Sequence, residues 1–175
     1  MVIGSDIDGT VLCYKQSVPP AVNYFLLRQW AGQQVSFVSN QGGIPSALAG
    51  LARQSSFIPY PTPERFVARL HALLSVCEEL CVEVVNISVC VYHPKAEVYY
   101  RHSAFTQLAE KLSWLNETHI DWALYNDPRM RKPQPWMLQY AQWPLAVFYG
   151  DSDEDEQAAQ AAKIPFVRVP RFGVE

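Results

Sequence analysis

Four short polar segments of the chain carry residues that could do chemistry together. They span residues 6–10, 39–43, 131–133 and 150–155. Between them they supply several carboxylates, a serine hydroxyl, a lysine, and glycines that let a ligand approach backbone N–H groups. A phosphate dianion needs positive charge and N–H donors before it can approach a carboxylate. This combination of residues therefore predicts phosphoryl transfer.

The acidic residues and the lysine have distinct predicted roles. Asp6 can attack phosphorus and form an aspartyl-phosphate. Asp8, two residues further on, can protonate the leaving oxygen and later take a proton from the hydrolytic water. Asp6 and Asp151 can hold Mg²⁺, a hard cation that prefers oxygen ligands. The cation and Lys132 would then offset the repulsion between the phosphate and the Asp6 carboxylate.

The remaining candidates would bind the substrate. We expect the Ser39 hydroxyl and nearby backbone N–H groups to hold the non-bridging phosphate oxygens. Arg131 is either an anion ligand, since an arginine fork suits a second phosphate or a carboxylate, or a surface charge. The candidate substrate-binding residues are Gly9, Thr10, Asn40, Gln41 and Arg131.

Short apolar runs alternate with longer helical stretches along the chain. The expected strands span residues 2–5, 34–39, 84–92, 145–149 and 165–169. The expected helices span residues 20–31, 45–55, 63–80, 104–115 and 155–162. This alternation predicts one α/β domain over residues 1–175, with a doubly wound, Rossmann-like parallel sheet of about five strands. Such sheets bind ligands beyond the carboxyl ends of their strands, where the four polar segments would converge.

Residues 93–131 are harder to assign. Residues 97–100 and 122–125 could each be a short strand, one on either side of the helix expected at 104–115. The segment follows a strand whose carboxyl end faces the predicted site, so we expect a small cap insertion that covers the site and selects the leaving group. Its candidate ligands and walls are Tyr92, Tyr99, Tyr100, Arg101, Arg129 and Arg131.

The four polar segments closely resemble, in order, the four motifs of the haloacid dehalogenase (HAD) superfamily of phosphatases. Asp-Ile-Asp-Gly-Thr at residues 6–10 is similar to the first motif. Ser39 and Lys132 are similar to the hydroxyl and the lysine of the second and third motifs. Asp151 and Asp155, which follow Gly150, are similar to the acidic pair of the fourth motif.

This resemblance implies a HAD-like fold and a role for each matched residue. Asp6 would be the nucleophile and Asp8 the acid/base, and Asp155 would support the site. The backbone carbonyl of Asp8 would join Asp6 and Asp151 as a metal ligand. Ser-Asn-Gln-Gly-Gly-Ile and Arg-Lys-Pro-Gln-Pro-Trp-Met also resemble subclass III, which contains heptose bisphosphate phosphatases, histidinol phosphatases and polynucleotide 3′-phosphatases.

A zinc loop found in the sugar-phosphatase branch is incomplete in this chain. Cys90 matches its first cysteine, but Tyr92 occupies the histidine position, and Pro128 and Met130 occupy the two later cysteine positions. His93 is the nearest substitute, and one cysteine with one histidine does not make a closed four-ligand site. We therefore expect Mg²⁺ and no zinc, and the role of His93 stays open.

Composition argues against several classes of protein. The 175 residues carry 14 Lys+Arg against 17 Asp+Glu, a formal net charge of -3, so no basic surplus drives non-specific binding to nucleic acids or membranes. We see no membrane-spanning stretch and no signal peptide. The four cysteines lack a redox spacing, which favours reduced thiols and a cytoplasmic location.

Together these observations predict a Mg²⁺-dependent phosphomonoester hydrolase that acts on a small phosphorylated metabolite. A polynucleotide 3′-phosphatase is the first alternative, with nucleic acid only as its substrate, and the acidic net charge favours the metabolite. A non-catalytic, partner-binding domain of the same fold is the second alternative. The sequence does not indicate an oligomeric state.

Overall fold

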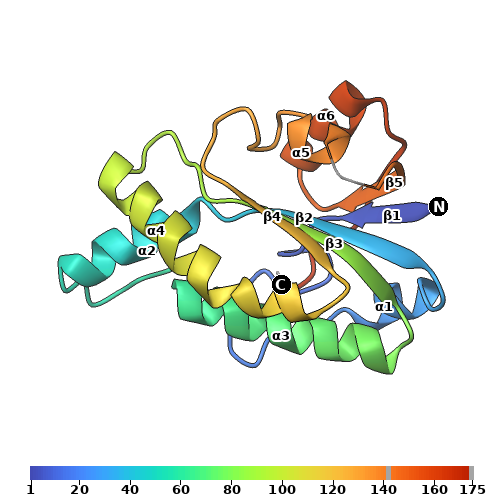
Figure 1. The fold of residues 1–175 in the computed structure, drawn as a ribbon, viewed down its shortest axis with the longest axis horizontal. Helices are drawn as coiled ribbons and strands as arrows, with labels where there is room; N and C mark the ends of the chain where they lie inside the picture. Colours follow the sequence, from blue (N-terminus) through green and yellow to red (C-terminus); the bar gives the residue numbers. More distant parts are fainter. Residues whose placement is uncertain (141–142, 174–175) are drawn as a thin grey trace.

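Six parallel strands form one sheet in the computed structural model, which describes residues 1–140 and 143–173 (Figure 1). The strands are β1 (Val2–Ser5), β2 (Gln34–Asn40), β3 (Glu83–Cys90), β4 (Asp121–Tyr125), β5 (Leu145–Gly150) and β6 (Phe166–Arg168). Their order across the sheet is β4-β3-β2-β1-β5-β6. The central strands are almost entirely buried, as parallel strands covered on both faces should be. The prediction of a doubly wound α/β fold is confirmed.

Helices cover both faces of this sheet. They are α1 (Tyr24–Gln29), α2 (Gly43–Ala52), α3 (Pro63–Glu79), α4 (Val98–Lys111), α5 (Trp136–Gln139) and α6 (Asp153–Ala162). Figure 1 shows α1, α3 and α4 on one face and α5 and α6 on the other. Successive side chains of β2 enter different cores, because neighbouring residues of a strand point to opposite faces. Phe37 packs in the cluster that contains Leu70 of α3, and Val38 in the cluster that contains Met137 of α5.

The strand order reverses at β1. The chain runs from β1 through β2 and β3 to β4 on one side, and later places β5 and β6 on the other side. The backbone N–H of Asp6 donates to the Tyr149 carbonyl at 2.9 Å, which fixes the end of β1 against β5. A crevice for ligands forms beyond the carboxyl ends of the strands at such a reversal.

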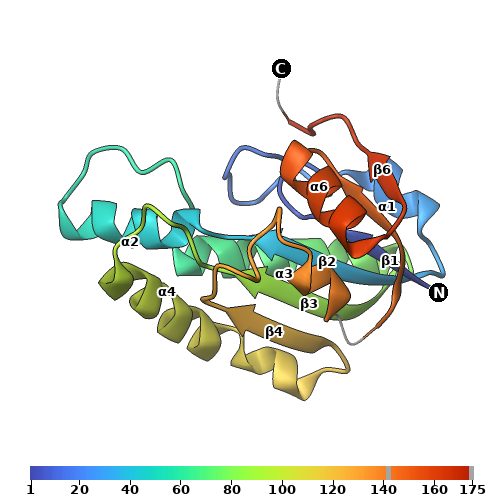
Figure 2. The same ribbon diagram turned by 90° about the horizontal axis from the view of Figure 1, so that it is seen from above.

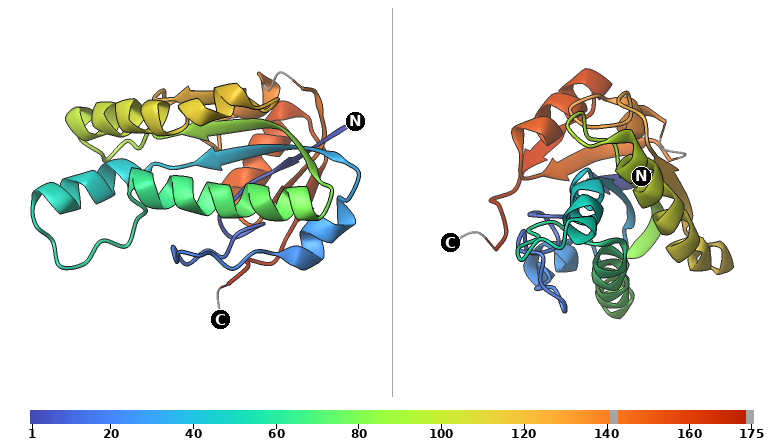
Figure 3. Two further views of the ribbon diagram at one scale, coloured as in Figure 1. Left: turned by 60° about the horizontal axis from the view of Figure 1, so that its bottom comes forward. Right: turned by 90° about the vertical axis from the view of Figure 1, so that its left-hand side faces the viewer.

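Helix α2 lies beyond the carboxyl ends of the strands rather than over a face of the sheet (Figure 2). The loop of residues 53–62 that follows it also projects past the sheet (Figure 3). The start of α4 lies beside α2, and an ion pair of 2.6 Å between Arg53 Nη2 and Glu97 Oε1 joins them. These segments therefore form a wall at one side of the strand ends.

Capping residues shift two helix starts from the expected positions. Helix α1 begins at Tyr24 instead of residue 20, because the Asn23 side chain accepts a hydrogen bond from the Leu26 N–H at 3.2 Å. Helix α6 begins at Asp153, because Ser152 and Asp155 form a reciprocal capping box.

The segment of residues 93–131 is mostly part of the sheet and of one helical layer. It supplies α4, a short 3₁₀ helix (Ser113–Glu117) and the edge strand β4. Residues 97–100 form the N-cap and first turn of α4 instead of a strand, whereas residues 122–125 do pair with β3. This edge strand raises the number of strands to six, against the five expected.

No helix within residues 1–140 and 143–173 combines the length and the apolar character needed to cross a membrane. The four cysteines are all free thiols, of which only Cys81 is exposed.

Candidate active site

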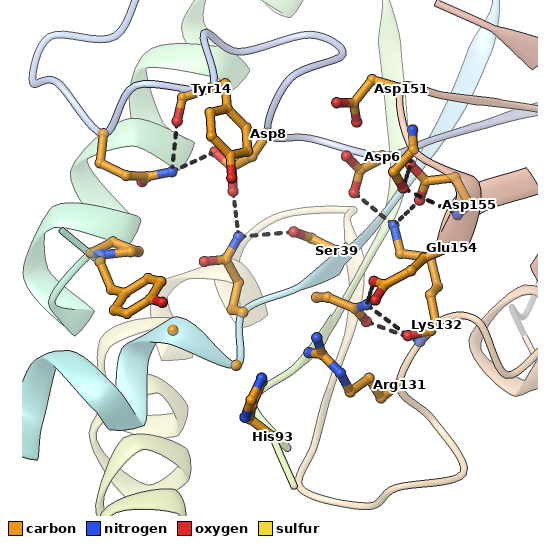
Figure 4. Close-up of a pocket in the computed structure, with 18 of the residues that line it drawn as sticks. Asp6, Asp8, Tyr14, Ser39, His93, Arg131, Lys132, Asp151, Glu154 and Asp155 are labelled. Carbon is orange, nitrogen blue, oxygen red and sulfur yellow. Dashed lines mark hydrogen bonds and ion pairs between the residues drawn. The ribbon is translucent and has the colours of Figure 1, made fainter. Parts of the chain in front are cut away.

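A cavity of about 750 Å³ opens at the carboxyl ends of β1, β2 and β5 (Figure 4). Nine of the residues singled out from the sequence line it. They are Asp6, Asp8, Ser39, Asn40, Gln41, Arg131, Lys132, Asp151 and Asp155. The convergence of these residues follows from the parallel sheet, which brings the ends of neighbouring strands together.

Lys132 connects two carboxylates at the floor of the cavity. Its Nζ lies 2.7 Å from Asp6 Oδ1 and 2.6 Å from Asp155 Oδ1, and it also donates to the Val38 carbonyl at 3.1 Å. Burial alone would lower the pKa of Lys132, but Asp155 and Asp6 raise it above its usual value. The ammonium group therefore stays charged and supplies fixed positive charge beside Asp6.

The two carboxylates that contact Lys132 differ in how they are held. Burial raises the pKa of Asp6 well above its usual range, and Lys132 opposes that change. Burial also works to raise the pKa of Asp155, but Lys132 and hydrogen bonds from Ser152 lower it. Both Asp155 oxygens are engaged, one by Lys132 and the other by the Ser152 hydroxyl at 2.7 Å and N–H at 3.2 Å. Asp155 therefore orients Lys132.

Asp6, Asp151 and Asp155 place carboxylate oxygens within 4.8 Å of one another. Asp151 follows the end of β5, and its Oδ2 accepts a hydrogen bond from Arg171 Nε. A Cβ atom on Gly9, whose φ is +85°, would lie 2.5 Å from Asp151 Oδ2, so only glycine allows this approach. Gly9 does not itself line the cavity.

These acidic groups fit a small divalent cation. Among the described residues, Asp6 Oδ2 and Asp151 Oδ1 accept no hydrogen bond, whereas both oxygens of Asp155 are occupied. Mg²⁺ is commonly held by one or two carboxylates, with water and substrate phosphate completing its shell. Asp6 and Asp151 thus have the donor set that such a site needs.

The Asp8 carboxylate is outside this acidic cluster and is held by nitrogen donors. Its Oδ2 accepts from Gln41 Nε2 at 2.6 Å, and its Oδ1 accepts from Arg69 Nη2 at 3.0 Å and from Gln16 Nε2 at 3.3 Å. Gln41 Nε2 also donates to Ser39 Oγ at 2.9 Å. Gln41 therefore links Ser39 to Asp8.

Thr10 does not take the position expected of a substrate ligand. It is fully buried and does not line the cavity. Its hydroxyl oxygen has no hydrogen-bond partner within the described part of the chain, and its carbonyl accepts from the Asn23 side chain at 3.0 Å. Its position indicates a role in packing the turn that follows β1.

Only the ends of the 93–131 segment reach the cavity. His93 and Arg131 line it, and Arg131 Nη1 donates to the Tyr92 carbonyl at 3.3 Å. The other expected ligands and walls of this segment do not line the cavity, because they lie on α4, in the turn before Arg131 or, for Tyr92, against the apolar cluster that contains Val38. They are Tyr92, Tyr99, Tyr100, Arg101 and Arg129.

Part of the cavity wall comes from elsewhere in the chain. Pro59, Tyr60 and Pro61 line the cavity from the loop after α2, and Tyr14 lines it from the loop after β1. The Tyr60 ring packs closely against Gly43. Sequence reasoning missed this wall, although the Pro-Tyr-Pro run before α3 is an unusual loop composition.

Two arginines at the site were also missed. Arg69 lies on the apolar face of α3 and is only 1% exposed, so a charged residue among the leucines of that face was the available signal. Arg171 contacts Asp151, and its guanidinium carbon lies 4.7 Å from the centre of the Tyr14 ring. Nothing in the sequence around Arg171 pointed to the site.

Cys90 and His93 are the two residues of this chain that could belong to the incomplete zinc loop. The buried Cys90 thiol donates to the Asp127 carbonyl at 3.6 Å. The His93 ring accepts a hydrogen bond from the Lys95 N–H at 3.1 Å through Nδ1. The absence of zinc stays a prediction.

Comparison with known proteins adds little to this geometry. No family model matches the chain, and no curated protein matches it either. One solved structure, named "putative nagD protein", is similar over 99% of this chain and 90% of its own, with a TM-score of 0.40 and 11% sequence identity. A likeness this distant does not indicate what this chain does, so any proposal of function rests on the site itself.

Proposed function

We propose that this protein is a Mg²⁺-dependent phosphomonoesterase that works through an aspartyl-phosphate on Asp6. One observation carries the proposal: the Asp6 carboxylate lies at the floor of an open cavity, against the Lys132 ammonium and within reach of Asp151. The motifs that resemble those of HAD phosphatases supply these residues, and the strand ends bring them together.

The reaction has two steps that use the same residues. In the first, Asp6 Oδ bonds to phosphorus while the bond from phosphorus to the leaving oxygen breaks, and Asp8, which enters this step protonated, gives that oxygen its proton. In the second, water bonds to phosphorus and passes a proton to Asp8, and the bond between phosphorus and Asp6 breaks. Inorganic phosphate leaves, and both aspartates return to their starting forms.

Asp6, Asp151 and the Asp8 backbone carbonyl are the proposed Mg²⁺ ligands. When bound, the cation supplies positive charge that lets a phosphate dianion approach Asp6. This charge matters because acids outnumber bases around the cavity. The acids are Asp6, Asp8, Asp151, Asp153, Glu154 and Asp155, and the bases are Arg131, Lys132 and Arg171.

The same lining supports a small phosphorylated metabolite as the substrate. A polynucleotide would bring several phosphates to a mouth that carries Asp153 and Glu154, and these carboxylates would repel it. A cavity of about 750 Å³ has room for a phosphate with a small organic group attached.

An assay with 4-nitrophenyl phosphate tests the proposal. We expect turnover with Mg²⁺ and its complete loss after EDTA treatment, with recovery when Mg²⁺ is restored. A matched Asp6→Asn variant should remain folded and inactive. Absence of turnover in the wild-type protein across aryl, sugar and nucleoside phosphates would favour a non-catalytic domain instead.

A further inference from the structure

The buried Arg69 side chain binds both the Asp8 side chain and the loop that follows β1. It extends from α3 and is 1% exposed, and its guanidinium has four acceptors. One is Asp8 Oδ1 at 3.0 Å. The other three are the backbone carbonyls of Cys13 at 2.7 Å, Ser17 at 2.8 Å and Lys15 at 3.0 Å. A buried arginine is costly unless its N–H groups are hydrogen-bonded, and Asp8 supplies the one side-chain acceptor among the four.

The three carbonyls belong to the loop that follows the turn after β1. This loop carries Tyr14 and Gln16, which both line the cavity, and Gln16 Nε2 is itself a donor to Asp8 Oδ1. Arg69 therefore acts on Asp8 in two ways. It contacts the carboxylate directly, and it fixes the loop that brings the second donor to the same oxygen.

The two oxygens of Asp8 are thus held from opposite sides. Arg69 and Gln16 hold Oδ1, and Gln41 from the end of β2 holds Oδ2. A carboxylate fixed at both oxygens cannot rotate freely, and proton transfer depends on such orientation.

We propose that Arg69 is a positioning residue for Asp8, which holds the acid/base in the orientation that proton transfer to the leaving oxygen requires. This inference rests on the proposed phosphatase function. Arg69 does not line the cavity, because its side chain is buried between α3 and the loop. Its effect on the reaction passes through Asp8.

Such a role predicts a dependence on the leaving group. An alkoxide is a poor leaving group and needs the proton of Asp8, whereas 4-nitrophenolate leaves without one. The value of kcat/KM reports the step in which Asp6 is phosphorylated, before the second use of Asp8. Misplacing Asp8 should therefore lower kcat/KM for benzyl phosphate much more than for 4-nitrophenyl phosphate.

The test compares these two substrates in the wild-type protein and in Arg69→Lys, which keeps the charge but loses the planar fork. We expect kcat/KM for benzyl phosphate to fall about 10²-fold, within the usual contribution of general acid catalysis, and that for 4-nitrophenyl phosphate to fall at least about tenfold less. Arg65→Lys, an exposed position on the same helix, is the matched control and should change neither value.

A double-mutant cycle separates positioning from general loss of structure. In an Asp8→Asn background, Arg69→Lys should cause little further loss with benzyl phosphate. Equal losses on the two substrates, or losses that add in the double mutant, would overturn the proposal. If Arg69→Lys does not fold, Arg69→Gln takes its place. If neither variant folds, Arg69 serves the fold through its carbonyl contacts, and the positioning role is rejected.

Failure of the proposed function gives a different result. In that case Asp6→Asn would match the wild-type protein, or the wild-type protein would turn over neither substrate. A failure of the Arg69 proposal alone leaves the dependence on Asp6 intact.

Discussion

The side chain of Asn40 holds the backbone of Lys132 through two reciprocal hydrogen bonds. Asn40 Oδ1 accepts from the Lys132 N–H at 3.0 Å, and Asn40 Nδ2 donates to the Lys132 carbonyl at 3.0 Å. The residues are 92 positions apart, so this contact joins the end of β2 to the segment before α5. It sets the position from which the Lys132 side chain reaches Asp6.

Replacing Asn40 by aspartate should weaken this contact. A carboxylate can still accept from the Lys132 N–H but cannot donate to its carbonyl, and it would also repel Glu154, whose Oε2 lies 3.4 Å from Asn40 Nδ2. We expect Asn40→Asp to lower kcat/KM about fivefold, which corresponds to about 1 kcal/mol for the hydrogen bond lost to the Lys132 carbonyl. Steady-state kinetics measure this, with Asn116→Asp as an exposed control that should behave like the wild-type protein. Unchanged kinetics in Asn40→Asp would show that Lys132 is positioned by other contacts.

The proposed metal site predicts that a substitution of Asp151 weakens Mg²⁺ binding. Removing its charge in Asp151→Asn should raise the Mg²⁺ concentration needed for half-maximal activity by at least about tenfold, because one of the two carboxylate ligands is lost. Isothermal titration of Mg²⁺ should show the same change without substrate, and Ca²⁺ should support turnover poorly. Asp127→Asn, which removes a carboxylate paired with Arg129 away from the cavity, should bind Mg²⁺ normally. Retention of Mg²⁺ affinity in Asp151→Asn would contradict the site, and one tightly bound zinc per chain would contradict the expected metal.

Tyr60, which lines the cavity, should contact the organic group that leaves the phosphate. Tyr60 lines the cavity, whereas Tyr99, a tyrosine of the 93–131 segment, is 73% exposed and does not. We expect Tyr60→Ala to lower kcat/KM for benzyl phosphate several-fold more than for methyl phosphate, because burial of an aromatic group contributes about 1–2 kcal/mol. Tyr99→Ala should leave both values unchanged. The reverse pattern would return substrate selection to the 93–131 segment.

The cysteines offer a test of the fold that does not depend on activity. Burial raises the pKa of Cys77 to about 12, so almost none of it is thiolate near neutral pH, and the thiolate is the reactive form. Iodoacetamide should therefore label exposed Cys81 in the native protein and leave Cys77 unmodified until the chain is denatured. Peptide mass spectrometry would locate the label. Rapid native labelling of Cys77 would mean that α3 does not pack as described.

The sequence was enough to predict the parallel sheet and nine of the residues that line the cavity. Their types and spacing are set by the chain itself, and parallel strands bring their carboxyl ends together whatever the details of the helices. The partners of Asp8 could not be predicted in this way. Gln41 lies next to a matched motif, but Arg69 is 61 positions from Asp8, and only the packing of α3 brings them together.

The structure of residues 93–131 could not be predicted in full from the sequence either. Its place after a strand that ends at the site suggested a cap, yet the segment contains an ordinary helix and an edge strand. The edge strand β4 has only five residues, and its half-buried side chains lack a strong pattern. The cavity wall comes instead from residues 59–61, which precede α3 in a loop with no periodic pattern.

The proposed mechanism depends most on Asp6 as the nucleophile, and trapping the aspartyl-phosphate tests this directly. In Asp8→Asn, hydrolysis of the aspartyl-phosphate should be slow, so acid quenching during turnover of 4-nitrophenyl phosphate with Mg²⁺ should preserve it. Peptide mass spectrometry should then find one phosphoryl group on Asp6, and Asp6→Asn should carry none and lose at least about 10³-fold in turnover. A phosphoryl group on another residue, or an Asp6→Asn variant that keeps most of its activity, would contradict the proposed mechanism.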